Sequence, residues 1–192
     1  VVMEFSDLGN ITQVGSPFVI PKAALMLAGF HPRFCSAGFR SLREQLLEYG
    51  GGFDLTLMVA VPKGSGLGTS SILASTVLAV LSDMFRLGWD RHAIAFRTLV
   101  LEQMLTTGGG WQDQFGGIFE GVKLVESRQG LIQRPTVRWA PDHLFTGREW
   151  RDHILLYYTG INRVAKNILS EIVRGMFLNS AGHLEILGSM KQ

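Results

Sequence analysis

The sequence predicts an α+β fold, because stretches with the spacing of strands and stretches with the spacing of helices both occur along the chain. Of the 192 residues, 46% are hydrophobic and 18% are charged, a balance typical of a well-packed globular protein. This length is enough for one domain, or for one domain and part of a second. In residues 53–85 a strand pattern, a glycine-rich turn and an apolar helix pattern follow one another.

Composition also limits the partners. A net charge of +2 without any long basic run gives no reason to expect nucleic acid or a membrane surface as a partner. The uncharged stretch 64–82 has the length of a membrane span, but its first third is loop-like, so we interpret the rest as a buried helix. The one cysteine, Cys35, can form no internal disulfide, which fits a reducing, cytoplasmic location. The five histidines lack the spacing of metal ligands.

In the first half of the chain, proline, glycine and capping residues indicate where helices begin and end. We expect a strand at the first residues, then a short helix over 22–28 with Pro21 in its first turn and Gly29 after it. Ser41 with Glu44 three residues later predicts a capped helix that ends at the following glycines.

The middle of the chain alternates between the two spacings. Apolar residues recur at every second position over 53–59, which predicts a strand. The stretch 69–85 is apolar almost all round, which predicts a central helix. Asp90 is a suitable N-cap for a helix over 91–105.

The second half is predicted to hold three short strands and two closing helices. The strands are expected at 118–126, 136–140 and 153–160, and the helices at 163–177 and 182–190.

The stretch VPKGSGLGTSS, residues 61–71, is suited to holding phosphates. A strand, a glycine turn and a helix start aim unpaired backbone N–H groups and the positive end of a helix dipole at one point. Glycines allow the backbone to approach a bulky anion, and Thr69, Ser70 and Ser71 add hydroxyls. The spacing matches neither a Walker loop nor a dinucleotide fingerprint, and a glycine turn without function remains an alternative.

A second cluster lies in LEQMLTTGGGWQDQFGG, residues 101–117. It places Glu102 near a helix end and Asp113 on an expected glycine-rich turn, flanked by Trp111 and Phe115. A carboxylate beside a phosphate site can orient an attacking hydroxyl or take its proton, and a second can help to hold Mg²⁺, which prefers oxygen ligands. Taken alone, Glu102 also fits a solvated helix residue, and Asp113 also fits a residue that caps a turn.

These motifs resemble a known superfamily. PKGSGLGTSS is similar to the phosphate-binding motif of the GHMP kinases, with threonine in place of the first serine. LVLEQMLTTGGGWQDQFGG and LLYYTGINRVAKNIL resemble the L-fucokinase branch, and the resemblance extends over essentially the whole chain. It implies a GHMP kinase fold, with an N-terminal domain of the ribosomal protein S5 domain 2-like type over 1–160 and the start of a C-terminal domain over 161–192.

The resemblance implies an enzyme that uses ATP and Mg²⁺ to phosphorylate the anomeric hydroxyl of L-fucose. Asp113 would act on the sugar hydroxyl, and Thr69, Ser70 and Glu102 would hold the metal. Two larger sets complete the implied site. ATP would be bound by Pro62, Lys63, Gly64, Ser65, Gly66, Leu67, Gly68, Thr69, Ser70 and Ser71. The sugar would be bound by Gly109, Gly110, Trp111, Gln112, Tyr158, Thr159 and Arg163.

The pattern departs from the family in two places. An N-terminal sugar-binding motif and a C-terminal glycine-rich motif are missing, so we expect an internal piece of a longer kinase, and we expect this piece to be inactive. The resemblance also implies a nucleotidyltransferase domain fused to the kinase in the full-length protein. A kinase of heptose 7-phosphate, whose relatives share a GWQDQ-like stretch, and a non-catalytic sugar- or nucleotide-binding relative are the alternatives.

Overall fold

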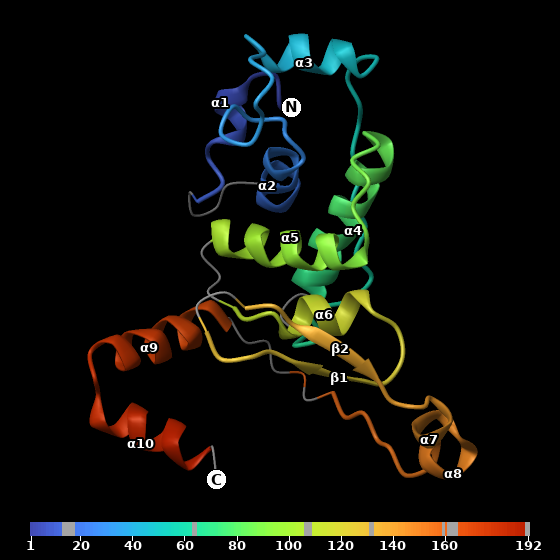
Figure 1. Cartoon of the computed structure of the whole chain (residues 1–192), viewed down its shortest axis with the longest axis vertical. Helices are drawn as coiled ribbons and strands as arrows, with labels where there is room; N and C mark the ends of the chain where they lie inside the picture. Colours follow the sequence, from blue (N-terminus) through green and yellow to red (C-terminus); the bar gives the residue numbers. More distant parts are fainter. Residues whose placement is uncertain are drawn as a thin grey trace.

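The computed structural model describes residues 1–12, 18–62, 65–105, 109–130, 133–158, 160 and 165–190. Within these residues it combines helices with one two-stranded antiparallel sheet, in keeping with the predicted α+β class (Figure 1). The helices are α1 Phe5–Leu8, α2 Val19–Leu27, α3 Leu42–Glu48, α4 Thr69–Met84, α5 Arg91–Met104, α6 Gln112–Ile118, α7 His143–Thr146, α8 Arg148–Arg151, α9 Ala165–Phe177 and α10 Ala181–Ser189. The strands are β1 Lys123–Glu126 and β2 Thr136–Trp139.

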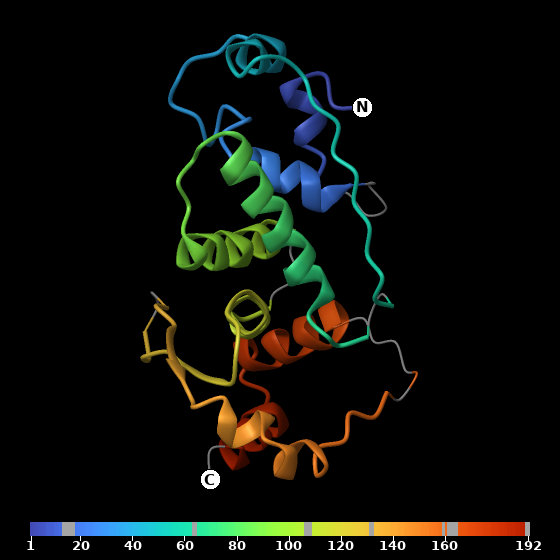
Figure 2. The same ribbon diagram turned by 90° about the vertical axis from the view of Figure 1, so that its right-hand side faces the viewer.

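Helix α4 is the centre of the fold, as its apolar sequence predicts. Helices α2, α5 and α6 pack against it, and Figure 2 shows it running diagonally from the N-terminal helices toward α6. Its buried apolar side chains recur at helical spacing, at Ala74, Val77, Leu78 and Leu81. Burying one such aliphatic side chain contributes about 1.5–3 kcal/mol, so this face anchors the glycine loop that precedes the helix. None of the helices within the described ranges is both long and apolar enough for a bilayer crossing.

The predicted helix caps are confirmed. The hydroxyl of Ser41 accepts a hydrogen bond from the Glu44 N–H at 3.1 Å, while the Glu44 carboxylate accepts one from the Arg40 N–H at 2.8 Å. At α5, the Asp90 carboxylate accepts from the Ala93 N–H at 2.7 Å. Each cap satisfies an amide that the first helical turn would leave without a partner.

At the N-terminus one prediction is wrong and one is confirmed. The expected strand is replaced by α1, where the Asp7 carboxylate accepts hydrogen bonds from the backbone amides of Met3 and Glu4 at 2.8 and 2.9 Å. These local bonds stabilise a helical turn at the expense of extended backbone. Helix α2 forms with Pro21 in its first turn, and Gly29 follows it with φ +94°.

The strand predicted over 53–59 is only partly correct. Phe53, Leu55 and Leu57 face the main core while the residues between them are exposed, so the alternation of a strand is present. However, the segment forms no ladder with another strand among the described residues, and Figure 2 shows it running alone along one side. Side-chain alternation depends on one buried face, whereas a ladder also needs a neighbouring backbone.

The predicted strand over 153–160 is also not a strand in the described residues. Residues 154–158 are extended but unpaired, and both faces are exposed; Leu155, for example, is 86% exposed. Before this segment the chain forms the short helices α7 and α8, which the sequence analysis did not predict. Their aromatic residues Phe145 and Trp150 contact each other with ring centroids 6.2 Å apart.

The strand expected over 118–126 is shorter than predicted, because Ile118 ends α6 and residues 119–122 connect that helix to β1. β1 pairs with β2 in an antiparallel register that aligns Val125 with Val137, and both valines pack on the buried rings of Phe115 and Phe119. The two closing helices are confirmed within the described residues as α9 and α10, which pack against each other. The division at residue 160 stays a prediction.

Candidate active site

The glycine loop leads directly into α4. Gly66 and Gly68 have φ of +77° and +66°, the left-handed region that glycine adopts without strain. Gly68 is the N-cap of α4 and offers no side chain to cap it. Lys63 and Gly64, two of the predicted ATP-binding residues, lie outside the described residues.

The backbone amides of this loop are available to a ligand. Within the described part of the chain, no acceptor is recorded for the N–H groups from Gly66 to Ser71, whereas the Ile72 N–H already bonds the Gly68 carbonyl at 3.0 Å. The first amides of a helix have no partner inside it and carry the positive end of its dipole. The loop therefore offers a row of donors suited to an anion.

Asp113 lies against this loop. A Cβ atom placed on Gly68 would stand 3.6 Å from Asp113 Cβ and 3.8 Å from its Oδ1, so the aspartate side chain lies beside a loop position that has no side chain. The prediction of a glycine turn around Asp113 is wrong, because the residue belongs to the first turn of α6. The carboxylate itself is exposed, while the neighbouring Phe115 is buried.

Glu102 is buried between three helices. It is only 7% exposed, which excludes the solvated-helix interpretation. Its Oε1 accepts a hydrogen bond from Ser71 Oγ of α4, and its Oε2 accepts one from Gln114 Nε2 of α6, both at 2.5 Å. Burial raises the pKa of the Glu102 carboxyl, the nearby Asp113 charge acts in the same direction, and the two hydrogen bonds oppose it.

The three hydroxyls of the loop differ in their surroundings. Ser71, predicted only as an ATP contact, is the one bonded to Glu102 and is 2% exposed. Ser70 is exposed at the start of α4, and the Thr69 hydroxyl lies 3.5 Å from that of Ser65. The pairing of Ser71 with Glu102 could not be read from the sequence, because it depends on how α4 and α5 approach each other.

Three of the predicted sugar-binding residues line a pocket beside α6. Gly110, Trp111 and Gln112 line a pocket of about 630 Å³, which also has Lys123 on its wall. Its volume falls in the range of small-molecule sites. Gly109 lies next to the site, because a Cβ added there would stand 3.9 Å from Glu102 Oε2.

The remaining predicted sugar contacts are not assembled here. Tyr158 ends the extended segment, is more than half exposed and does not line the pocket beside Trp111. Thr159 and Arg163 lie outside the described residues. Gln114 and Lys123 are the residues that sequence reasoning missed; the second glutamine of the QDQ stretch was the one available signal for Gln114.

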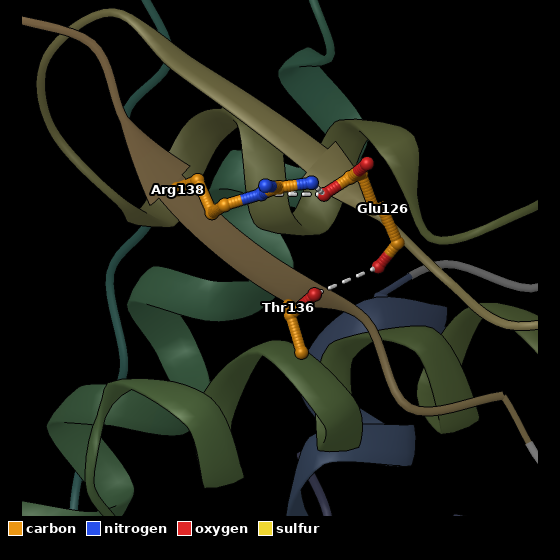
Figure 3. Close-up of polar contacts among 3 residues, drawn as sticks. All are labelled: Glu126, Thr136 and Arg138. Atoms are coloured by element: carbon orange, nitrogen blue, oxygen red, sulfur yellow. Dashed lines mark hydrogen bonds and ion pairs between the residues drawn. The ribbon is translucent and has the colours of Figure 1, made fainter.

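A second pocket, of about 660 Å³, lies on the polar face of the hairpin. Figure 3 shows Arg138 of β2 reaching across to the Glu126 carboxylate, with which it forms an ion pair, while the Thr136 hydroxyl contacts the Glu126 carbonyl at 3.4 Å. Arg128 and Arg134 complete the basic rim. This exposed pair is worth at most about 1 kcal/mol, so the hairpin depends mainly on its apolar face.

Comparison with known proteins finds a matching family. Residues 34–121, which include the glycine loop and α6, match the family described as GHMP kinases N terminal domain.

Individual relatives narrow the comparison. The chain is 59% identical over 191 residues to an L-fucokinase/L-fucose-1-P guanylyltransferase of Bacteroides fragilis, and 36% identical over 163 residues to a bifunctional fucokinase/GDP-fucose pyrophosphorylase of Arabidopsis thaliana. It is 31% identical over 145 residues to a D-glycero-alpha-D-manno-heptose 7-phosphate kinase of Campylobacter jejuni. These matches cover 100%, 84% and 73% of this chain, but only 20%, 14% and 40% of the respective relatives.

Proposed function

We propose that the chain carries the phosphate-binding and acceptor-activating part of an ATP-dependent sugar kinase that converts L-fucose to L-fucose 1-phosphate. The observation that carries this proposal is the contact between Asp113 and Gly68, which brings a carboxylate to the row of loop amides. Similarity to two fucokinases supports the choice of substrate. The proposal includes an N-terminal domain of the ribosomal protein S5 domain 2-like type over 1–160, followed by the start of a second domain.

The loop would bind the ATP phosphates. In phosphoryl transfer most of the catalytic stabilisation is electrostatic, and fixed backbone donors supply it without reorganisation. The amides from Gly66 to Ser71 are suited to this role, and we include Pro62, Lys63, Gly64 and Ser65 in the ATP-binding set.

The residues beside the loop also fit Mg²⁺. Thr69, Ser70 and Glu102 offer only oxygen donors, the ligands that this ion prefers, and Glu102 reaches the start of α4 through Ser71. When bound with ATP, Mg²⁺ would neutralise charge on the phosphates. Glu102 would keep its carboxylate oriented through the hydrogen bonds that it accepts from Ser71 and Gln114.

Asp113 would orient the anomeric hydroxyl and accept its proton as that oxygen attacks the γ-phosphorus of ATP, whose bond to the bridging oxygen breaks to release ADP. The exposed carboxylate lies in the first turn of α6, between the loop and the residues that line the pocket. Gly109, Gly110, Trp111 and Gln112 would contact the sugar, with an aromatic face available for its C–H groups. Tyr158, Thr159 and Arg163 are retained as proposed sugar contacts.

A kinase of heptose 7-phosphate is the second candidate, favoured by the 31% identical relative. The test is to incubate the full-length protein with ATP and either L-fucose or the heptose phosphate, and to identify the product by ³¹P NMR. We expect a sugar 1-phosphate from L-fucose and little turnover of the heptose phosphate. No turnover of L-fucose would overturn the first choice, and turnover of neither would favour a non-catalytic relative.

The setting of the kinase is proposed as well. The two fucokinase relatives are named as bifunctional proteins, which supports a fused nucleotidyltransferase in the full-length protein. The single cysteine supports a cytoplasmic location.

A further inference from the structure

Three buried polar side chains join the three helices around the site. Ser71 of α4, Glu102 of α5 and Gln114 of α6 are 2%, 7% and 1% exposed. The Glu102 carboxylate accepts from the Ser71 hydroxyl through one oxygen and from the Gln114 amide through the other. Each helix contributes one member, so the carboxylate ties α4 to α6.

This linkage holds the same two turns that carry the proposed chemistry. Gln114 directly follows Asp113, and Ser71 lies three residues after Gly68. The neighbouring contact between the two helices is close, because a Cβ atom on Gly117 would stand 2.8 Å from Ile72 Cγ1. A shift of Gln114 or Ser71 would therefore move Asp113 relative to the loop amides.

The polar character of the linkage is informative. Apolar side chains could fill the same buried space without giving up hydration, so a buried polar set is costly unless its hydrogen bonds are made. Since an ionised carboxylate only accepts hydrogen bonds, the NH₂ group of Gln114 must face Glu102. The Oε1 atom of Gln114 is then buried with no partner among the described residues. The orientation of the Gln114 amide is therefore set by its hydrogen bond to Glu102.

We propose that Ser71 and Gln114 are positioning residues, a role that rests on the proposed kinase function. In this role it is their side chains that act, through Glu102, while the backbone amide of Ser71 stays in the row of loop donors proposed for the ATP phosphates. They fix the Glu102 carboxylate in one orientation and, through it, hold Asp113 against Gly68 at the distance that the reaction needs. Small displacements of the reacting groups lower the rate of the reaction. Groups that orient catalytic side chains typically affect activity by about 10- to 100-fold.

The test uses Ser71→Ala and Gln114→Met in the full-length protein, with Ser75→Ala as the matched control. Ser75 is a buried serine one turn along α4, and its hydroxyl bonds the Ile72 carbonyl of its own helix at 2.8 Å. We expect each of the two variants to lower kcat on the order of 10- to 100-fold with little change in the KM for ATP, while Ser75→Ala keeps the parent kcat.

Two further readouts separate positioning from simple loss of stability. The double variant Ser71→Ala/Gln114→Met should be little slower than either single variant, because the linkage acts as a unit. Hydrogen exchange of the amides in 112–118 should be faster in Gln114→Met and unchanged in Ser75→Ala. Ser71→Thr, which keeps the hydroxyl, should restore part of the lost kcat.

The outcomes are distinct from those of the proposed function. If the parent phosphorylates L-fucose and Ser71→Ala and Gln114→Met keep its kcat, the positioning role is overturned. If kcat falls only in proportion to the fraction of unfolded protein, measured by thermal unfolding, the linkage is merely structural. If the parent itself has no kinase activity, the proposed function fails first, and the exchange data alone report on the linkage.

Discussion

At the scale of single residues, the site depends on a side chain that is absent. Gly68 has no Cβ, and one placed there would stand in ordinary van der Waals contact with Asp113, 3.6 Å from its Cβ. The positive φ makes this position selective for glycine. The adjacent Glu102 carboxylate is buried, so the two acidic groups of the site lie in different environments.

We expect Gly68→Ala to impair the reaction beyond its effect on folding. Alanine at φ +66° costs about 1–2 kcal/mol, and its methyl group would stand 3.6 Å from Asp113 Cβ, beside the carboxylate that the reaction needs. Gly88→Ala is the matched control, because Gly88 has φ +67° and nothing within 4 Å. Thermal unfolding should show similar losses of stability in both variants, and only Gly68→Ala should lower kcat/KM. Equal activities in the two variants would contradict this account of the contact.

The raised pKa of Glu102 predicts a pH dependence of stability. Because the folded state binds this proton more tightly than the unfolded state, the stabilisation is full below the unfolded pKa and is lost as the pH rises through the folded pKa. In metal-free buffer, the unfolding free energy of the parent should therefore fall as the pH rises above the usual pKa range of a glutamate side chain. Glu102→Gln should remove part of this fall.

The matched control for that measurement is Glu48→Gln, at an exposed glutamate. Urea unfolding at a series of pH values gives the unfolding free energy of each variant as a function of pH. The interpretation fails if Glu102→Gln and Glu48→Gln change the pH dependence to the same extent.

At the scale of elements, the contact of α4 with α6 places Asp113. Gly117→Ala should force the helices apart, because its Cβ would lie 2.8 Å from Ile72 Cγ1, and overpacking of this kind costs about 1–3 kcal/mol. Gly116→Ala in the same helix meets nothing within 4 Å and should stabilise slightly. Urea unfolding measures both changes. Adding Ile72→Ala to Gly117→Ala should recover stability; failure to do so would show that the clash is not the cause.

How far the sequence predicts these elements depends on the range of the interactions. Ser41 and Asp90 mark helices through local bonds, so these starts are predictable. Helix α6 was missed because Gly116 and Gly117 lie inside it, each costing about 1 kcal/mol of helix propensity, which tertiary packing overcomes. Over 53–59 the side-chain alternation was predicted correctly, but neither this segment nor the described part of 153–160 forms a ladder, because a ladder needs a distant partner that spacing does not reveal.

In the candidate site, too, the residue types could be predicted from the sequence, whereas contacts between distant segments could not. Glycines, hydroxyls and carboxylates in 61–71 and 101–117 indicate the chemistry, and the structure brings Gly68 and Asp113 together. The joint role of Ser71 and Gln114 could not be predicted, because three helices meet at Glu102 only in the folded chain.

At the scale of the whole molecule, one segment presents an unusual surface. Residues 154–158 expose consecutive apolar side chains on an unpaired extended backbone, with Leu155 and Leu156 mostly exposed. Such a segment is a template for pairing with another chain. The chain also spans a fifth of the length of its bacterial fucokinase relative.

We therefore expect the 192-residue chain to self-associate in a concentration-dependent manner, as measured by size-exclusion chromatography with light scattering. Leu155→Lys should shift it toward the monomer, whereas Leu47→Lys, at an exposed leucine of α3, should not. A monomer at all concentrations, or an equal effect of both substitutions, would contradict this prediction.

The measurement that tests the central claim most directly is the rate of ATP consumption with L-fucose in the full-length protein carrying Asp113→Asn. The account predicts a fall of about 10²- to 10⁴-fold relative to the parent, and an unchanged rate in Asp83→Asn, a variant at an exposed aspartate near the far end of α4. A rate equal to the parent's in Asp113→Asn would show that the carboxylate beside the glycine loop does not serve the reaction.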